Sequence, residues 1–214
     1  MQGLIVDWGG VLTMPIHMAI GSWIKATGVD LDHYGAVLGR WVEPLPGEMS
    51  PVHQLERGEI ALEDFEHLLS SALAREGSAV EAQGLVTTMF ADLAIYEDSM
   101  TSLVTRAHAA GVRTALLSNS WGLDYDRSDW VDMFDVVVIS GEVGMRKPER
   151  QIFDLTLDRI RLPAAECVFI DDMAHNVAAA GEAGLAGILH RSFDQTASEL
   201  EALFPGAGWI HLRH

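Results

Sequence analysis

The amino-acid sequence predicts an α/β protein with a doubly wound parallel sheet and a helical segment inserted after the first strand. Two observations lead to this prediction. Short apolar runs alternate with amphipathic helical patterns along most of the chain, as in proteins built from βα units around a parallel sheet. The segment 14–92 breaks this alternation, because it has helical patterns but no strand pattern.

The apolar runs are rich in Val, Ile or Leu and are expected to be the strands. They do not alternate with polar residues, so they suit strands that are buried on both faces of a sheet. They are LIVD at 4–7, TALLS at 114–118, DVVVIS at 135–140, CVFID at 167–171 and the weaker AGILH at 186–190. Together they predict a Rossmann-like core.

Helical patterns lie between these runs and within the inserted segment. In the core they cover 98–111, with Gly111 as a natural end, 150–160 and 174–184. In the insertion they cover 17–28 and 61–77, and the Pro/Gly-rich stretch 43–51 separates the two. We therefore expect a core domain formed by 1–13 and 93–214, with a helical insertion at 14–92.

Composition narrows the possible functions. The formal net charge is -17 and the pI is about 4.7, so the surface is expected to repel nucleic acids and acidic membranes. A single cysteine, Cys167, excludes an internal disulfide framework and fits a reducing compartment. No apolar run is long enough to span a bilayer, and the N-terminus is a strand pattern rather than a leader. We expect a cytoplasmic protein.

Polar residues gather where the predicted strands end. Asp7, Ser118 and the pair Asp171–Asp172 each close a strand, and Lys147 follows the strand that ends at residue 140. The carboxyl ends of strands in an open parallel sheet form the ligand crevice, so these residues are expected to meet. Carboxylates from separate strands suit Mg²⁺, and the serine and lysine suit a phosphoryl group.

These motifs resemble those of the haloacid dehalogenase (HAD) superfamily of hydrolases, in its subfamily with a small helical cap after the first motif. The resemblance implies that the insertion at 14–92 is this cap domain. The four matching stretches are LIVDWGGVLT, ALLSNS, GEVGMRKPE and VFIDDMAHN, in the family's order.

The resemblance assigns a role to each motif residue. It implies that Asp7 is the nucleophile that forms an aspartyl-phosphate. Ser118 would bind phosphoryl oxygens, and Lys147 would neutralise Asp7 and the phosphate. Asp171 would bind Mg²⁺, with Asp172 supporting the ion directly or through water. The implied function is a Mg²⁺-dependent phosphatase that acts on a small phosphorylated metabolite.

The first motif departs from the family at Gly9, where phosphatases usually carry a second aspartate that serves as general acid and base. Loss of such a group typically lowers a rate by about 10²–10⁴. The family uses the backbone carbonyl at this position as a Mg²⁺ ligand, and Gly9 supplies a carbonyl equally well. The resemblance therefore implies that the acid is lost while the metal site of Asp7, Gly9, Asp171 and Asp172 is kept.

Four consequences of Gly9 stay open. The leaving group could need little protonation, as in an anomeric sugar phosphate or an acyl phosphate. Another residue, His17 first and His53 second, could supply the proton, because histidine titrates near neutrality. The protein could be a catalytically impaired binding or regulatory domain. It could also be a metal-independent 2-haloacid dehalogenase, with Arg40 holding the halide. The residues expected to bind substrate are Asn119, which follows Ser118, together with His17 and Arg40.

Overall fold

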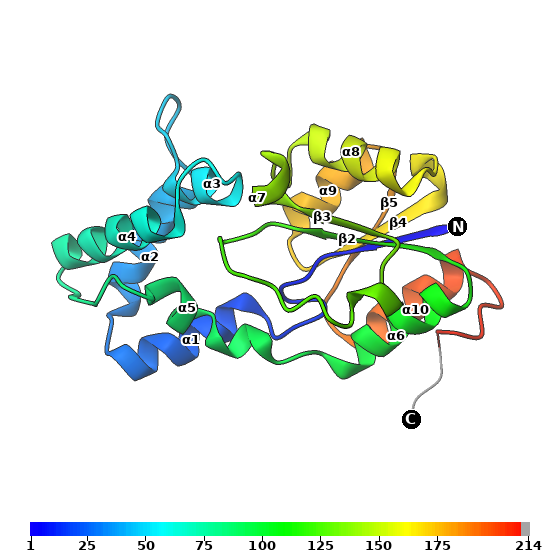
Figure 1. The fold of residues 1–214 in the computed structure, drawn as a ribbon, viewed down its shortest axis with the longest axis horizontal. Coiled ribbons are helices and arrows are strands. Elements are labelled where there is room, and N and C mark those ends of the chain that lie inside the picture. The colour runs from blue at the N-terminus through cyan, green and yellow to red at the C-terminus, as the bar shows by residue number, and fades with distance from the viewer. Residues whose placement is uncertain (211–214) are drawn as a thin grey trace.

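A computed structural model describes residues 1–210 and shows a sheet of parallel strands in the order β3-β2-β1-β4-β5 (Figure 1). The strands are β1 (Gly3–Val6), β2 (Arg113–Ser118), β3 (Val136–Ile139), β4 (Cys167–Asp171) and β5 (Ala186–Leu189). Val6 at the end of β1 pairs with Leu116 on one side and Ile170 on the other. The predicted fold class is confirmed.

Helices cover both faces of the sheet. One face packs against α6 (Asp98–Ala109) and α10 (Phe193–Leu203), and the other packs against α8 (Arg150–Ile160) and α9 (Ala174–Glu182) (Figure 1). Alternation along β1 explains the two layers, since Leu4 and Val6 lie in one apolar cluster and Ile5 in the other. The helix predicted over 98–111 ends two residues early, and Gly111 adopts a φ of +86° just after it.

The segment after β1 forms a separate helical layer, at the left of Figure 1. Its helices are α1 (Ile16–Thr27), α2 (Leu31–Val42), α3 (Pro51–Glu56), α4 (Leu62–Glu76) and α5 (Leu85–Met89). They enclose an apolar cluster of their own, in which Phe65, Leu69 and Leu73 recur every four residues along the buried face of α4. This insertion has its own core, distinct from the two clusters of the sheet.

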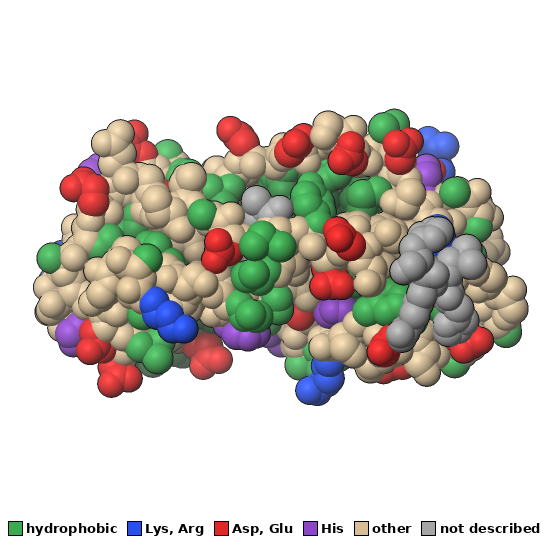
Figure 2. All heavy atoms as spheres, turned by 90° about the horizontal axis from the view of Figure 1, so that it is seen from below, with side chains coloured by type: hydrophobic (Ala, Val, Ile, Leu, Met, Phe, Trp, Pro, Cys, Tyr) green, Lys and Arg blue, Asp and Glu red, His purple; other side chains and the backbone are tan. Residues whose placement is uncertain are grey.

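Shorter elements join these layers. They are α7 (Ser140–Val143) and the 3-10 turns Ala91–Ala94, Trp130–Asp132 and Ala164–Glu166. The face shown in Figure 2 carries acidic side chains over both the insertion and the core, with few basic ones among them. Within residues 1–210, no helix has both the length and the apolar character needed to cross a bilayer.

Candidate active site

The candidate site lies where the chain changes direction across the sheet. The connections after β1 and β2 lead outward to β3, and β4 then returns to the other side of β1. Asp7 follows the end of β1, and Asp171 is the last residue of β4. Because ligands of open α/β sheets bind at this kind of switch point, the two carboxylates occupy the expected position.

Lys147 joins the two carboxylates. Its Nζ lies 2.8 Å from Asp7 Oδ1 and 2.7 Å from Asp171 Oδ2, and its side chain is only 1% exposed. Burying an ammonium group is costly unless it is paired, and here it has two anionic partners. One of the two lysines in the whole sequence is therefore fixed inside the site.

A third carboxylate completes the cluster. Asp7, Asp171 and Asp172 each offer an oxygen that lies within 4.8 Å of the others. Gly10 permits this approach, because a Cβ at that position would lie 2.3 Å from Asp172 Oδ2 and its φ is +77°. Glycine is thus required at residue 10 both for backbone conformation and for space.

Neighbouring groups orient Asp171. The Met173 backbone N–H donates to Asp171 Oδ1 at 2.8 Å, and Asn176 Nδ2 lies 3.1 Å from each carboxylate oxygen. Asn176 is buried, and its Oδ1 has no hydrogen-bond partner among the described residues. With Lys147 on Oδ2, the Asp171 carboxylate is held from three directions.

Burial disfavours the charged forms of the carboxylates in the cluster. It raises the pKa of Asp7 to about 7, against the opposing effect of Lys147 and with a further increase from Asp171. Burial and the charge of Asp171 likewise raise the pKa of Asp172 to about 6. Burial alone would lower the pKa of Lys147, but Asp171 and Asp7 raise it above its usual range. Three carboxylates facing one ammonium group leave room for another positive charge.

This donor set fits Mg²⁺, which prefers hard carboxylate oxygens and keeps part of its water shell. The raised pKa values of Asp7 and Asp172 point the same way, since a nearby cation would relieve the repulsion that causes part of each increase. Asp7, Asp171 and Asp172 are the residues whose side chains would hold the ion.

Ser118 and Asn119 lie beside the cluster and have different surroundings. Ser118 is 2% exposed at the end of β2, and its Oγ lies 3.2 Å from the hydroxyl of Tyr125. Asn119 forms two hydrogen bonds with the Lys147 backbone. Its Oδ1 accepts from the Lys147 N–H at 2.9 Å, and its Nδ2 donates to the Lys147 carbonyl at 3.1 Å. The side-chain amide of Asn119, which was expected to contact substrate, therefore holds the loop that carries Lys147 (the lysine loop) in place.

The other three predicted residues, His17, His53 and Arg40, lie in different surroundings. His17 is exposed at the start of α1 and lies close enough to Asp172 to oppose, slightly, the increase in the pKa of that carboxyl. His53, on α3, has its pKa lowered by burial and by the charges of Arg146 and Arg57. Arg40 points elsewhere, because its guanidinium pairs with Glu76 at 2.7 Å and its side chain is 59% exposed. This ion pair links α2 to α4 at the surface, and a contact between Arg40 and substrate stays a prediction.

At Gly9 the structure shows what lies beside the position of the family's second acid. A Cβ built on Gly9 would lie 3.2 Å from Ile16 Cδ1 and 3.3 Å from Ile16 Cγ1. Ile16 belongs to the apolar packing of the insertion. An isoleucine thus borders the space into which a side chain at residue 9 would project.

Two features escaped the sequence reasoning. Tyr125 contacts Ser118, yet it stands in a loop without a motif. Ion pairs also link the insertion to the lysine loop: Glu56 binds Arg146, and Arg57 binds Glu149, with Arg57 Nε 2.9 Å from Glu149 Oε1. The only available signal was the charged sequence around residues 56–59, which does not show which residues it contacts.

Fold and cluster together define a carboxylate–lysine site on a doubly wound sheet that carries a helical insertion. The sequence profile of haloacid dehalogenase-like hydrolases matches residues 1–184. The chain belongs to this hydrolase family, and the predicted family is confirmed.

Relatives and solved structures agree with this assignment. The chain is 33% identical to a sesquiterpene phosphatase, astK, of Aspergillus oryzae, over 94% of this chain and 96% of that protein. The chain is also 30% identical to acyl-CoA dehydrogenase family member 10 of Mus musculus. This match covers 94% of this chain but only 19% of that longer protein. A HAD family enzyme of Bacteroides thetaiotaomicron, solved with magnesium and inorganic phosphate, has the same fold, with a TM-score of 0.66, 20% identity and coverage of 89% of this chain and 94% of that one.

Proposed function

We propose that this protein is a Mg²⁺-dependent phosphatase that hydrolyses a small phosphorylated metabolite through an aspartyl-phosphate at Asp7. The observation that carries the proposal is the convergence of Asp7, Asp171 and Asp172 around the buried Lys147. The likeness to a sesquiterpene phosphatase over nearly the full length of both chains supports phosphate monoesters as the substrate class. That name also makes isoprenoid phosphates the first substrates to test.

In this proposal Asp7 attacks phosphorus. Lys147 stays paired with the attacking carboxylate and screens the charge of the incoming phosphate, while Ser118 donates to a phosphoryl oxygen. Asp7, Asp171 and Asp172 would hold Mg²⁺ with their side chains, and the resemblance to the family adds the backbone carbonyl of Gly9 as a ligand. When bound, Mg²⁺ supplies positive charge at the phosphoryl oxygens, where negative charge is spread in the transition state.

We extend the proposal to the division of the chain. Residues 14–92 act as the cap, and 1–13 with 93–214 act as the core; residues 211–214 lie outside the described part. The separate apolar cluster of the insertion supports this division. A cytoplasmic location and the absence of nucleic-acid and membrane partners stay predictions from the acidic composition.

A panel assay tests the function. Phosphate release is measured from isoprenoid, sugar, acyl and aryl phosphates, with Mg²⁺ or with EDTA. We expect Mg²⁺-dependent turnover that Asp7→Asn abolishes and that Asp64→Asn, at an exposed acid of α4, leaves in place. A panel that is silent even with an aryl phosphate would overturn the proposal in favour of a binding protein. Chloride release from a 2-haloacid in EDTA would identify a dehalogenase instead.

A further inference from the structure

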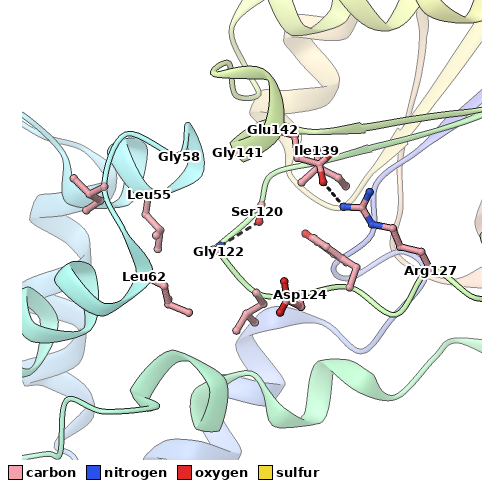
Figure 3. Close-up of a pocket in the computed structure, with 13 residues that line it drawn as sticks. Leu55, Gly58, Leu62, Ser120, Gly122, Asp124, Arg127, Ile139, Gly141 and Glu142 are labelled. Carbon is pink, nitrogen blue, oxygen red and sulfur yellow. Dashed lines mark hydrogen bonds and ion pairs between the residues drawn. The ribbon is translucent and has the colours of Figure 1, made fainter.

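A cavity of about 440 Å³ lies between the insertion and the core (Figure 3). The end of α3 and the start of α4 form one wall, and the loop after β2 forms the wall opposite, with α7 closing one end. The volume is within the range of small-molecule sites. It is large enough for an organic group of metabolite size.

The wall formed by the insertion is apolar. Leu55, Ile60 and Leu62 face the cavity there, and Leu123 and Ile139 add apolar surface from the core. Such a surface gains free energy by burying hydrocarbon and gains nothing from a charged group.

The polar groups of the other wall largely bind one another. Arg127 pairs with Glu142, and the Gly122 N–H donates to Ser120 Oγ at 3.1 Å (Figure 3). Asp124 and Glu142 bring two carboxylates to the cavity. These carboxylates disfavour a ligand with a second anionic group, so the cavity suits an uncharged organic group whose apolar part lies against the leucines of the insertion.

Tyr125 connects this cavity with the carboxylate cluster. Its side chain lines the cavity, while its hydroxyl lies 3.2 Å from Ser118 Oγ. The charges of Asp7 and Lys147 both act on this hydroxyl, and burial raises its pKa, so it is a protonated donor at neutral pH. The ring is held edge-on against Trp8, with centroids 5.8 Å apart. The hydroxyl thus stands at the junction between the phosphate site and the cavity.

We propose that this cavity is the leaving-group site, which holds the apolar organic part of a phosphate monoester, and that Tyr125 donates its proton to the oxygen joining that part to phosphorus. The inference rests on the proposed phosphatase function and names its substrate class and the group that replaces the acid missing at Gly9. We place the phosphate between Asp7 and Ser118 and its organic group in the cavity, so that the bridging oxygen meets the Tyr125 hydroxyl, which lies 3.2 Å from Ser118 Oγ.

The two steps need no reactant other than the ester and water. An Asp7 oxygen forms a bond to phosphorus as the bond from phosphorus to the leaving oxygen breaks. The bond's electron pair stays on that oxygen, which takes the Tyr125 proton to give the alcohol. Water then attacks the phosphorus of the aspartyl-phosphate and gives a proton to the tyrosinate, which frees phosphate and restores both side chains.

Binding of alkylphosphonates, which are not hydrolysed, tests the cavity without turnover. With Mg²⁺ present, the affinity of the wild type should rise about three- to fourfold for each methylene until the cavity is full. Leu62→Trp fills the cavity and should remove this dependence. Leu68→Trp, at a position of α4 where the side chain is 46% exposed, should keep it. Affinity that is independent of chain length in the wild type, or no binding, would overturn the cavity assignment.

The leaving-group dependence of Tyr125→Phe tests the donor. We expect kcat/KM to fall about 10²-fold for an alkyl phosphate but less than about threefold for 4-nitrophenyl phosphate, whose leaving oxygen needs no proton. Tyr96→Phe makes the same change at the other tyrosine that contacts Trp8, with ring centroids 5.4 Å apart, and should leave both rates near wild type. Equal losses on the two substrates would show that Tyr125 is only structural.

The two proposals fail differently. If no ester is hydrolysed but phosphonate affinity still grows with chain length, the phosphatase function and the Tyr125 role are overturned while the cavity assignment stands. If esters are hydrolysed with Asp7 as the nucleophile but chain length has no effect on binding or rate, the phosphatase stands and the cavity assignment is overturned.

Discussion

Gly9 and Ile16 form the site's clearest departure from the family pattern, and the departure involves both residues. Replacing the acid with glycine removes a proton donor, and Ile16 then occupies the neighbouring space, with a Cβ at residue 9 only 3.2 Å from its Cδ1. Reversing one residue alone therefore does not restore the family's arrangement. A crowded carboxyl beside an aliphatic side chain would be misplaced and poorly solvated.

This pairing predicts the outcome of restoring the acid. Gly9→Asp alone should raise kcat/KM for an alkyl phosphate by no more than about threefold, whereas Gly9→Asp with Ile16→Ala should gain roughly 10²-fold, since a positioned acid contributes 10² or more. Gly9→Ala with Ile16→Ala is the matched control for volume and should show no such gain. An equal gain in the single and double variants would mean that Ile16 does not obstruct the acid.

The pKa of Asp7 leads to a second prediction, about how the free energy of unfolding depends on pH in EDTA. This pKa is about 7 in the folded protein and near the ordinary aspartate value of 3.8 in the unfolded chain, because burial and the neighbouring carboxylates favour the protonated form in the fold. A raised folded-state pKa gives stability that is fully present below about pH 4 and is lost as the pH rises through about 7. Relative to wild type, Asp7→Asn should therefore be more stable at pH 8 than at pH 4, by roughly 1–3 kcal/mol.

Urea unfolding at the two pH values measures this difference. Asp64→Asn, at an exposed position, reports the general effect of removing one negative surface charge. A stability difference between Asp7→Asn and wild type that does not change with pH would contradict the assigned ionisation of Asp7.

At the scale of elements, α3 contacts the loop that carries Lys147. Glu56 binds Arg146, the residue before the lysine, and Arg57 binds Glu149, two residues after it. Gly58 allows the approach, because a Cβ there would lie 2.6 Å from the Gly141 carbonyl oxygen. The insertion therefore supports the core loop that carries Lys147.

A double-mutant cycle on Glu56→Gln and Arg146→Gln tests this support. Because the two side chains are 8% and 12% exposed, each single change should cost roughly 2–4 kcal/mol of unfolding free energy, with the double variant losing less than the sum. Activity should fall in each single variant, since the lysine loop loses a tether. Arg40→Gln breaks an exposed ion pair of the same insertion and should cost less than about 1 kcal/mol. Additive losses in the double variant would show that Glu56 and Arg146 do not act together.

Elements also show what sequence reasoning can predict. Strands such as 167–171 were predictable, because a continuous apolar run suits a strand buried on both faces. The helix α2 was missed: Gly35 and Gly39 lower its helix propensity, and its stability comes from packing of Val37 and Leu38 and from the Asp30 cap.

The site likewise contains residues that the sequence predicts and one that it does not. Asp7, Lys147, Asp171 and Asp172 were predictable from order along the chain, since strand ends converge at one edge. Tyr125 was not, because its contact with Ser118 depends on the path of an irregular loop.

At the scale of the whole molecule, the net charge of -17 affects any measurement of metal binding. An acidic surface attracts every cation, so part of any stabilisation by Mg²⁺ would be general screening. The cluster of Asp7, Asp171 and Asp172 differs from the surface in that its carboxylates are held within 4.8 Å of one another around a buried lysine. Specific binding and screening can therefore be separated by substitution and by ionic strength.

Thermal unfolding in EDTA, in NaCl and in MgCl₂ of matched ionic strength separates the two effects. At a free Mg²⁺ concentration about 100 times the Kd, binding adds about 2.7 kcal/mol, which is a rise in Tm of roughly 5–10 °C for a chain of this size. NaCl should give only a small rise. Asp172→Asn should lose most of the Mg²⁺-specific part and keep the NaCl response, while Asp126→Asn, at an exposed acid outside the cluster, should keep both. If the Tm of Asp172→Asn rises with Mg²⁺ as much as that of the wild type, the three carboxylates do not form the metal site, and the stabilisation comes from the acidic surface as a whole.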